Sequence, residues 1–281
     1  MVNVQDGKFK AAATYNSASD HYNDLALSFW DYHGRRTIDN LKLNRGDTIL
    51  DVACGAGSSA IPAAEMVGQE GKVIGIDLAE KLLEHARKKG SERSLNNTEF
   101  RVGDMEKLED YFHENDDAQF DAVVCVFAIF FVNDMESQIR KLWKLVKSNG
   151  GKLAITTWGP RMFEPAYSGW NNILKLEAPD LYAASNPWDR ITDINSVRRL
   201  IQNGVTPGTA KIEVLEEHAT QPLKAPDDWW TVALGSGLRW AIDQLDPPTI
   251  QKIRQANIQF VNTNNIKAIE TNAIYSIATK N

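Results

Sequence analysis

The stretch Ile49-Leu50-Asp51-Val52-Ala53-Cys54-Gly55-Ala56-Gly57-Ser58-Ser59-Ala60 decides the fold of this chain. Its apolar first half predicts a buried strand over about residues 48–53, and the residues 61–66 that follow predict a helix. Gly55 and Gly57 allow a tight turn between the two, in which the backbone can approach a ligand closely. Because the helix N-terminus points unpaired N–H groups at the same place, the stretch predicts a ligand-binding turn.

An acidic residue ends the next predicted strand. Asp77 follows Val73-Ile74-Gly75-Ile76 and stands 20 residues after Gly57. At about this distance an acidic residue accepts hydrogen bonds from ribose hydroxyls in nucleotide-binding units. Residues 55–60 also fit the dinucleotide fingerprint G-x-G-x-x-A, so an NAD(P)-dependent oxidoreductase is one hypothesis. Asp51 favours another kind of cofactor site. A carboxylate inside a buried strand requires hydrogen bonds, and Asp51 would gain them by orienting the glycine turn.

The strand and turn resemble the first motif of the class I S-adenosylmethionine-dependent methyltransferases, in the small-molecule branch that contains quinone and other secondary-metabolite methyltransferases. That motif is an acidic residue followed by a glycine-rich turn, matched here by Asp51, Ala53, Gly55 and Gly57. Many members of the family have glycine where this chain has Ala53. The resemblance implies that these residues bind the cofactor S-adenosylmethionine together with Asp77 and its neighbour Leu78. It covers residues 41–157 well and the rest of the chain in outline.

A third element of the resemblance follows the strand predicted at about residues 98–102. The strand ends in Gly103-Asp104-Met105, and an acidic residue at this place matches the family motif that reads adenine. The resemblance implies that Asp104 accepts the N6 hydrogen and that the Met105 N–H meets a ring nitrogen. It also implies that residues 127–134 lie beside the methyl group, with Phe127 at the cofactor and Phe131 at the acceptor.

The remaining elements complete an α/β fold. A strand at about residues 120–126 is apolar through its middle, as expected of a central parallel strand. By resemblance the fold is a Rossmann-like, seven-stranded, mostly parallel sheet with the last strand antiparallel, helices on both faces and a helical cap. We expect one methyltransferase domain over residues 1–281, divided into a cofactor-binding core at 41–157, sheet-completing segments at 193–217 and 266–281, and cap segments at 8–40, 158–190 and 226–262. Within these, 228–244 and 248–262 are predicted helices and 269–278 is the last strand.

Seven of the eight tryptophans of the chain lie in the cap segments. Tryptophan supplies a large apolar area with one polar group, which suits a pocket for a flat or greasy metabolite. We therefore expect an apolar or aromatic acceptor that contacts Trp30, Phe131 and Trp158. Tyr22 is a candidate catalytic residue because N-terminal helices of the resembled family often cover the pocket. His33 is a candidate base, since its ordinary pKa suits proton removal near neutrality.

Composition limits the possible partners. The net charge of −6 argues against nonspecific binding of nucleic acid, which requires a basic surface. The longest apolar run, residues 122–132, is too short to span a bilayer. Cys54 and Cys125 lie in predicted inner strands without metal-ligand partners at usual spacing, so we expect no metal site. Reduced thiols and a start without a signal peptide predict a cytoplasmic protein. The acceptor and the oligomeric state are not fixed by the sequence.

Three functions are compatible with these motifs. Methyl transfer from S-adenosylmethionine explains why no catalytic dyad stands out, because the sulfonium is a strong electrophile and catalysis is mostly alignment in a water-poor pocket. An NAD(P)-dependent oxidoreductase would need a second mononucleotide-binding half after residues 120–126, which is hard to recognise. A cofactor-binding protein that has lost catalysis would retain the same motifs.

Overall fold

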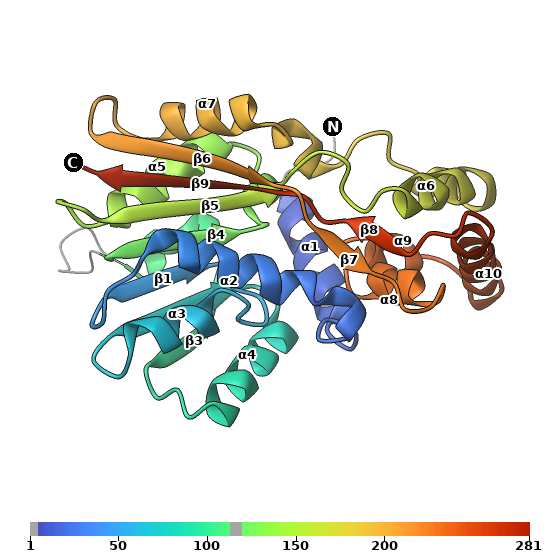
Figure 1. Cartoon of the computed structure of the whole chain (residues 1–281), viewed down its shortest axis with the longest axis horizontal. Coiled ribbons are helices and arrows are strands. Elements are labelled where there is room, and N and C mark those ends of the chain that lie inside the picture. The colour runs from blue at the N-terminus through green and yellow to red at the C-terminus, as the bar shows by residue number, and fades with distance from the viewer. Residues whose placement is uncertain (1–4, 113–119) are drawn as a thin grey trace.

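A seven-stranded sheet forms the centre of the computed structural model, which describes residues 5–112 and 120–281 (Figure 1). The strands are β1 (Thr48–Val52), β2 (Lys72–Asp77), β3 (Thr98–Val102), β4 (Ala122–Val126), β5 (Lys152–Trp158), β6 (Ala210–Glu217) and β9 (Ala273–Lys280). They are ordered β3-β2-β1-β4-β5-β9-β6. Strands β1 to β5 are parallel, and β9 runs antiparallel to both β5 and β6. The predicted α/β sheet with an antiparallel last strand is confirmed.

Helices cover both faces of this sheet. One face carries α2 (Phe29–Leu41) and α3 (Ala60–Val67), the other carries α5 (Met135–Leu145) and α7 (Ile194–Gly204), and α4 (Glu80–Glu92) packs beside β3. Adjacent residues of β1 serve the two faces, since Ile49 packs in the core with α2 and α3 and Leu50 in the core with α5 and α7. This double coverage explains the continuous apolar runs of the inner strands.

The cap gathers beyond one end of the sheet (Figure 1). It contains α6 (Ala166–Glu177), α8 (Asp228–Leu234), α9 (Arg239–Ile242), α10 (Pro247–Thr263) and the two-stranded ribbon of β7 (Thr220–Pro222) and β8 (Ala268–Glu270). Helix α1 (Gln5–Ala18) lies between the cap and the sheet. Short 3₁₀ helices connect the longer elements: η1 (Leu25–Leu27), η2 (Met105–Asp110), η3 (Ile129–Phe131), η4 (Pro179–Leu181) and η5 (Pro187–Ile191). In the described part of the chain, none of the helices has both the length and the apolar character that crossing a bilayer requires.

The predicted helix at 228–244 is divided into α8 and α9 at Gly235-Ser236-Gly237. Glycine lowers the stability of a helix interior, so a pair of glycines favours an interruption. Leu27 also packs closely against Gly235, where a Cβ would lie 2.6 Å from its side chain. The break therefore lets the segment 25–27 pack against the cap.

The predicted strand at 269–278 is likewise divided, into β8 and β9. Asn272 lies at the division, where its side chain accepts a hydrogen bond from the Ala219 N–H (3.0 Å) and donates one to the Pro160 carbonyl (3.0 Å). These bonds replace part of the strand ladder and let the chain pass from the cap ribbon into the central sheet.

Candidate active site

A cavity of about 930 Å³ opens at the carboxyl ends of β1 to β4. Ligands of open α/β sheets bind at this edge of the sheet. The cavity brings together most of the predicted site residues, namely Tyr22, Trp30, Ala53, Gly55, Asp77, Leu78, Asp104, Met105, Phe127 and Phe131. The structure places the other four outside its lining: Asp51, Gly57, His33 and Trp158.

Asp51 lies behind the glycine turn. Its carboxylate is 1% exposed and accepts a hydrogen bond from the Ser59 hydroxyl, with 2.6 Å between Oδ2 and Oγ. Burial raises the pKa of Asp51 to about 7, although the Ser59 bond lowers it, and the nearby charge of Asp77 raises it further. Ser59 immediately precedes α3 and lines the cavity. Asp51 therefore fixes the start of α3 from inside the sheet.

The two glycines of the turn have different neighbours. Both adopt left-handed conformations that favour glycine, with φ of +51° at Gly55 and +81° at Gly57. Gly55 lines the cavity. A Cβ at Gly57 would lie 3.1 Å from Ile61 of α3 and 3.2 Å from Ala86 of α4. Gly55 thus gives a ligand access to the backbone, while Gly57 lets α3 and α4 pack closely.

Asp77 presents its carboxylate to the cavity at the end of β2. Oδ2 accepts a hydrogen bond from the Gly55 N–H at 2.8 Å and Oδ1 accepts one from the Ala79 N–H at 2.7 Å. Burial raises the pKa of Asp77, whereas the bonds from these backbone N–H groups lower it. Leu78 contributes a third backbone bond. The two carboxylate oxygens together have about four lone-pair sites, so the group retains acceptor capacity for a ligand. This geometry suits a pair of neighbouring hydroxyls.

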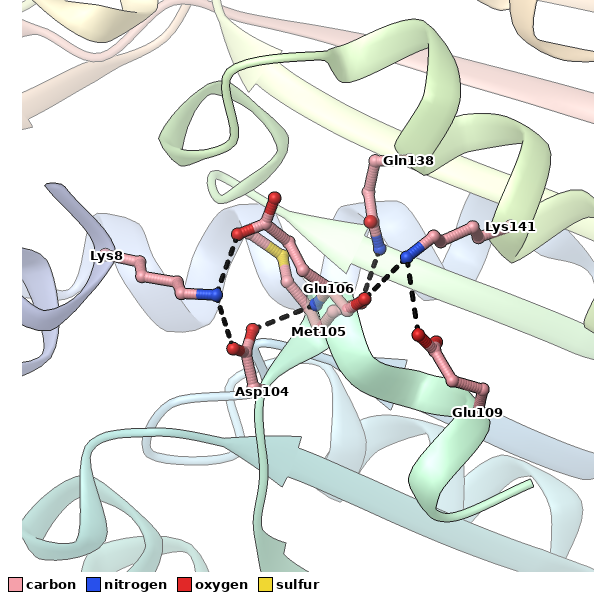
Figure 2. A network of polar contacts seen from close by, with 7 residues as sticks. All are labelled: Lys8, Asp104, Met105, Glu106, Glu109, Gln138 and Lys141. Atoms are coloured by element: carbon pink, nitrogen blue, oxygen red, sulfur yellow. Dashed lines mark hydrogen bonds and ion pairs between the residues drawn. The ribbon is translucent and has the colours of Figure 1, made fainter. Parts of the chain in front are cut away.

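The turn after β3 carries Asp104 and Met105 (Figure 2). Both residues line the same cavity. Asp104 Oδ1 accepts a hydrogen bond from the Glu106 N–H at 2.9 Å, which caps η2. Two side chains of α5 bind carbonyl oxygens of the turn, Gln138 Nε2 at Met105 (2.6 Å) and Lys141 Nζ at Glu106 (2.6 Å). The turn is thus held from the side of α5 through its backbone.

Two residues other than glycine adopt left-handed backbone conformations at the edge of the cavity. Ala53 follows β1 with φ of +57°, and Phe127 follows β4 with φ of +53°. Such a conformation costs about 1–2 kcal/mol for a residue with a Cβ, and strain of this kind clusters at functional sites. The Phe127 ring stacks on Trp158 with 4.0 Å between centroids and 16° between planes. Trp158 therefore lies behind Phe127 as seen from the larger cavity.

A second, smaller cavity adjoins the first; its volume of about 290 Å³ includes space that is open to solvent. Tyr15 of α1 and Trp30 of α2 line both cavities. The rest of its lining is mainly aromatic and apolar, comprising Phe130, Trp158, Met162, Phe163, Trp188, Ser236, Gly237 and Leu238. Of the seven tryptophans in the segments that the sequence assigned to a cap, Trp30, Trp158 and Trp188 therefore line this cavity. The other four, Trp170, Trp229, Trp230 and Trp240, line neither cavity.

Tyr22 and His33 have very different surroundings. The Tyr22 ring stacks on Trp30, with 5.4 Å between centroids and 3° between planes, and burial raises its pKa well above the usual value. The phenol therefore stays protonated near neutral pH. His33 is fully buried, its Nδ1 lies 2.6 Å from the Tyr275 hydroxyl, and burial lowers its pKa to about 4. His33 is neutral in this environment and lines neither cavity.

Sequence reasoning missed several residues that contact or support the cavity, among them Tyr15, Lys8, Glu106 and Gly34. Tyr15, Lys8 and Glu106 line the cavity but belong to no motif, so nothing in the sequence distinguishes them. Gly34 lies in α2 directly against the glycine turn, where a Cβ would be 2.2 Å from the Ser58 carbonyl oxygen. A glycine inside an amphipathic helix often has such a packing reason, and this was the available signal.

Known proteins resemble this chain in sequence and in fold. The profile of the family described as a methyltransferase domain matches residues 49–150. Aklanonic acid methyltransferase of Streptomyces sp. strain C5 is 33% identical over 156 residues, which cover 55% of this chain and 68% of that relative. The chain belongs to the class I S-adenosylmethionine-dependent methyltransferases. The predicted family is confirmed.

Other relatives of this methyltransferase match over a shorter length. Demethylmenaquinone methyltransferase of Oceanobacillus iheyensis is 33% identical over 126 residues, 45% of this chain and 51% of that protein. The chain thus spans about half the length of that curated relative. The structure of YcgJ from Bacillus subtilis covers 89% of this chain and 98% of its own, with a TM-score of 0.54 and 15% identity, and shows the fold alone.

Family membership settles the broad function. The methyl donor is S-adenosylmethionine and the acceptor is a small molecule. The NAD(P) alternative is not supported, because the sheet continues after β4 as β5, antiparallel β9 and β6 in place of a second parallel half.

Proposed function

We propose that this methyltransferase acts on a small molecule with a flat apolar or aromatic body, which binds in the smaller cavity. The observation that carries this proposal is the wall that the two cavities share through Tyr15 and Trp30. An acceptor must be held next to the methyl donor for transfer, so its chamber has to adjoin that of the cofactor. Aromatic walls offer ring systems a large contact area.

We assign the larger cavity to S-adenosylmethionine, which supplies an electrophilic methyl group when bound. The spare acceptor capacity of Asp77 supports a ribose site, and the turn at Asp104 and Met105 supports an adenine site. In this assignment Ala53 and Gly55 offer backbone to the methionine part, and Leu78, Phe127 and Phe131 supply apolar walls. Asp51 and Gly57 act indirectly, by holding the turn and the helices around it.

We infer that catalysis relies on alignment and on the exclusion of water. Tyr22 stays protonated and stacks on Trp30, and aromatic faces of this kind stabilise a nearby cation. An acceptor whose nucleophile ionises readily, such as an aromatic carboxylate or an acidic phenol, needs no protein base. The name of the Streptomyces relative describes its acceptor as an acid, which accords with this class. His33 as a base stays a prediction that its burial does not favour.

We also propose a cytoplasmic location. Both cysteines, Cys54 and Cys125, are free and buried, as is usual in a reducing compartment.

Trp188 offers a direct test of the acceptor site. It lies half-buried in η5 and packs edge-on against Phe130, with 6.0 Å between ring centroids. Trp188→Ala should raise the KM for aromatic acids and phenols about tenfold, since it removes one large aromatic contact. Transfer of tritium from [methyl-³H]S-adenosylmethionine to a panel of such acceptors measures this. Affinity for S-adenosylhomocysteine should stay within about twofold, because Trp188 does not line the larger cavity.

Trp170→Ala is the matched control. Trp170 is a buried cap tryptophan that packs near Trp230 and lines neither cavity. Its replacement should lower the melting temperature without changing the KM for the acceptor. Methylation of polar, nonaromatic acceptors alone, or an unchanged KM in Trp188→Ala, would contradict the proposed acceptor class.

A further inference from the structure

Lys8 links helix α1 to the turn assigned to adenine (Figure 2). Its Nζ lies 2.5 Å from Asp104 Oδ2 and 3.0 Å from Glu106 Oε2, across 96 residues of sequence from Asp104. The side chains of Lys8 and Asp104 are only 16% and 11% exposed. We propose that Lys8 is a positioning residue of the cofactor site, whose ammonium group holds α1 closed over the bound cofactor by bridging Asp104 and Glu106.

Helix α1 forms part of the wall of the cofactor cavity. Lys8, Ala11, Ala12 and Tyr15 all line that cavity. A ligand that occupies the space next to Asp104 therefore lies under the first turns of α1. For a cofactor to leave past these turns, the contacts that hold α1 to the rest of the protein have to break.

Apolar packing holds this helix chiefly at Tyr15, toward its C-terminal end. Tyr15 packs against Phe131, with 6.0 Å between ring centroids, whereas the buried residues among the other described side chains of 8–18 are the small Thr14 and Ala18, and Phe9 is 56% exposed. The first turns are held by charged groups, with Lys8 on Asp104 and Glu106 and with Lys10 Nζ 3.3 Å from the Trp240 ring centroid. Loss of the Lys8 charge therefore removes a large share of the contacts of this end.

The two sides of the adenine turn are held by different chemistry. From α5, Gln138 and Lys141 bind carbonyl oxygens, which fixes the backbone of the turn. From α1, Lys8 binds the carboxylates of Asp104 and Glu106. The turn thus has a fixed side and a side whose attachment depends on side-chain charge. Asp104 also belongs to the proposed adenine site. The Lys8 bridge therefore does two things at once: it holds α1 closed and it positions the carboxylate that contacts the cofactor.

This inference rests on the proposed place of the cofactor, and a double-mutant cycle tests it. The measured quantity is the dissociation rate of [³H]S-adenosylhomocysteine, chased with unlabelled compound, in the full-length protein. Lys8→Met should raise this rate about tenfold, as expected for the loss of a largely buried charged hydrogen bond. Lys8→Arg should restore it to within about threefold, because arginine also binds two carboxylates.

Glu106→Gln supplies the second arm of the cycle and leaves Asp104 intact. Alone it should raise the rate about threefold, and combined with Lys8→Met it should add nothing further, because both changes break one bridge. Lys141→Met is the matched control, since it removes a cation from the same turn on the α5 side. In that background Glu106→Gln should keep its full effect.

Two outcomes would overturn the role of Lys8. One is a wild-type dissociation rate in Lys8→Met, and the other is a double variant whose rate is the product of the two single effects. A wild-type protein that fails to bind S-adenosylhomocysteine would instead refute the cofactor assignment itself. Melting temperatures within a few degrees of wild type, measured without ligand, show that the variants remain folded.

Discussion

Replacing Asp77 with alanine should weaken S-adenosylhomocysteine binding roughly ten- to a hundredfold. The carboxylate reaches the cavity and retains acceptor capacity beyond the bonds from the backbone N–H groups of Gly55, Leu78 and Ala79. A hydrogen bond to a charged acceptor contributes about 1.5–3 kcal/mol, and about 1.4 kcal/mol corresponds to a tenfold change in affinity. Loss of the ribose contacts therefore predicts the stated range.

The same change removes the acceptor of these backbone N–H groups. We therefore expect the free energy of unfolding of Asp77→Ala to fall by about 1–3 kcal/mol as well. Asp121→Ala separates the two effects. Asp121 precedes β4 at the opposite end of the sheet, accepts a hydrogen bond from the Thr48 N–H at 2.9 Å and pairs with Lys147. Its loss should lower stability but leave the cofactor affinity unchanged.

Isothermal titration calorimetry at a temperature where all variants are folded measures the affinity. Asp77→Ala with the wild-type Kd for S-adenosylhomocysteine would refute the ribose assignment. Asp121→Ala should bind S-adenosylhomocysteine with the wild-type affinity. If its affinity falls as much as that of Asp77→Ala, the loss comes from general destabilisation of the sheet and the reasoning is refuted.

Three further changes test the supports of the site. Asp51→Asn should change how the free energy of unfolding depends on pH. Burial raises the folded pKa of Asp51 from 3.8 to about 7, so the contribution of this group to stability is fully present below pH 4 and is lost as pH rises to 7, by at most about 4 kcal/mol at about 1.36 kcal/mol per pH unit. Urea unfolding at pH 5 and pH 8 measures the free energy of unfolding of both proteins. An equal change between the two pH values in wild type and Asp51→Asn would contradict the raised pKa of Asp51. Gly34→Ala should destabilise the protein by about 1–3 kcal/mol because the new Cβ meets the Ser58 carbonyl, and a wild-type melting temperature would count against this close approach. Ala53→Gly should stabilise it by about 0.5–1 kcal/mol by relieving the left-handed conformation, so a lower melting temperature would contradict the strain.

The sheet could be predicted from the sequence because its determinants are local. The apolar strand before Gly55, the acidic residue at Asp77 and the strand before Asp104 each carry their own pattern, and their spacing implies one edge of one sheet. The cap could be predicted only in outline. The division of the 228–244 helix and of the 269–278 strand depends on partners from distant segments, which have no signal in the local pattern.

The residues of the site also fall into two groups, those that the sequence predicts and those that depend on contacts between distant segments. Residues that follow strands were placed in the cavity by the regular geometry of the sheet, as with Asp104 and Phe127. Lys8 is different, because its place depends on how a polar helix docks across the cavity. His33 carries the residue type that suits a base, but whether it is buried is decided by the packing of α2 against Tyr275 of β9. A residue type alone does not tell these cases apart.

A crystal structure of the complex with S-adenosylhomocysteine tests the central claim most directly. We predict ribose hydroxyls within hydrogen-bond distance of Asp77, the adenine N6 at Asp104, and the sulfur turned toward the wall that Tyr15 and Trp30 share with the smaller cavity. A sulfur turned away from that wall, or a ligand bound outside the cavity at the ends of β1 to β4, would contradict the account.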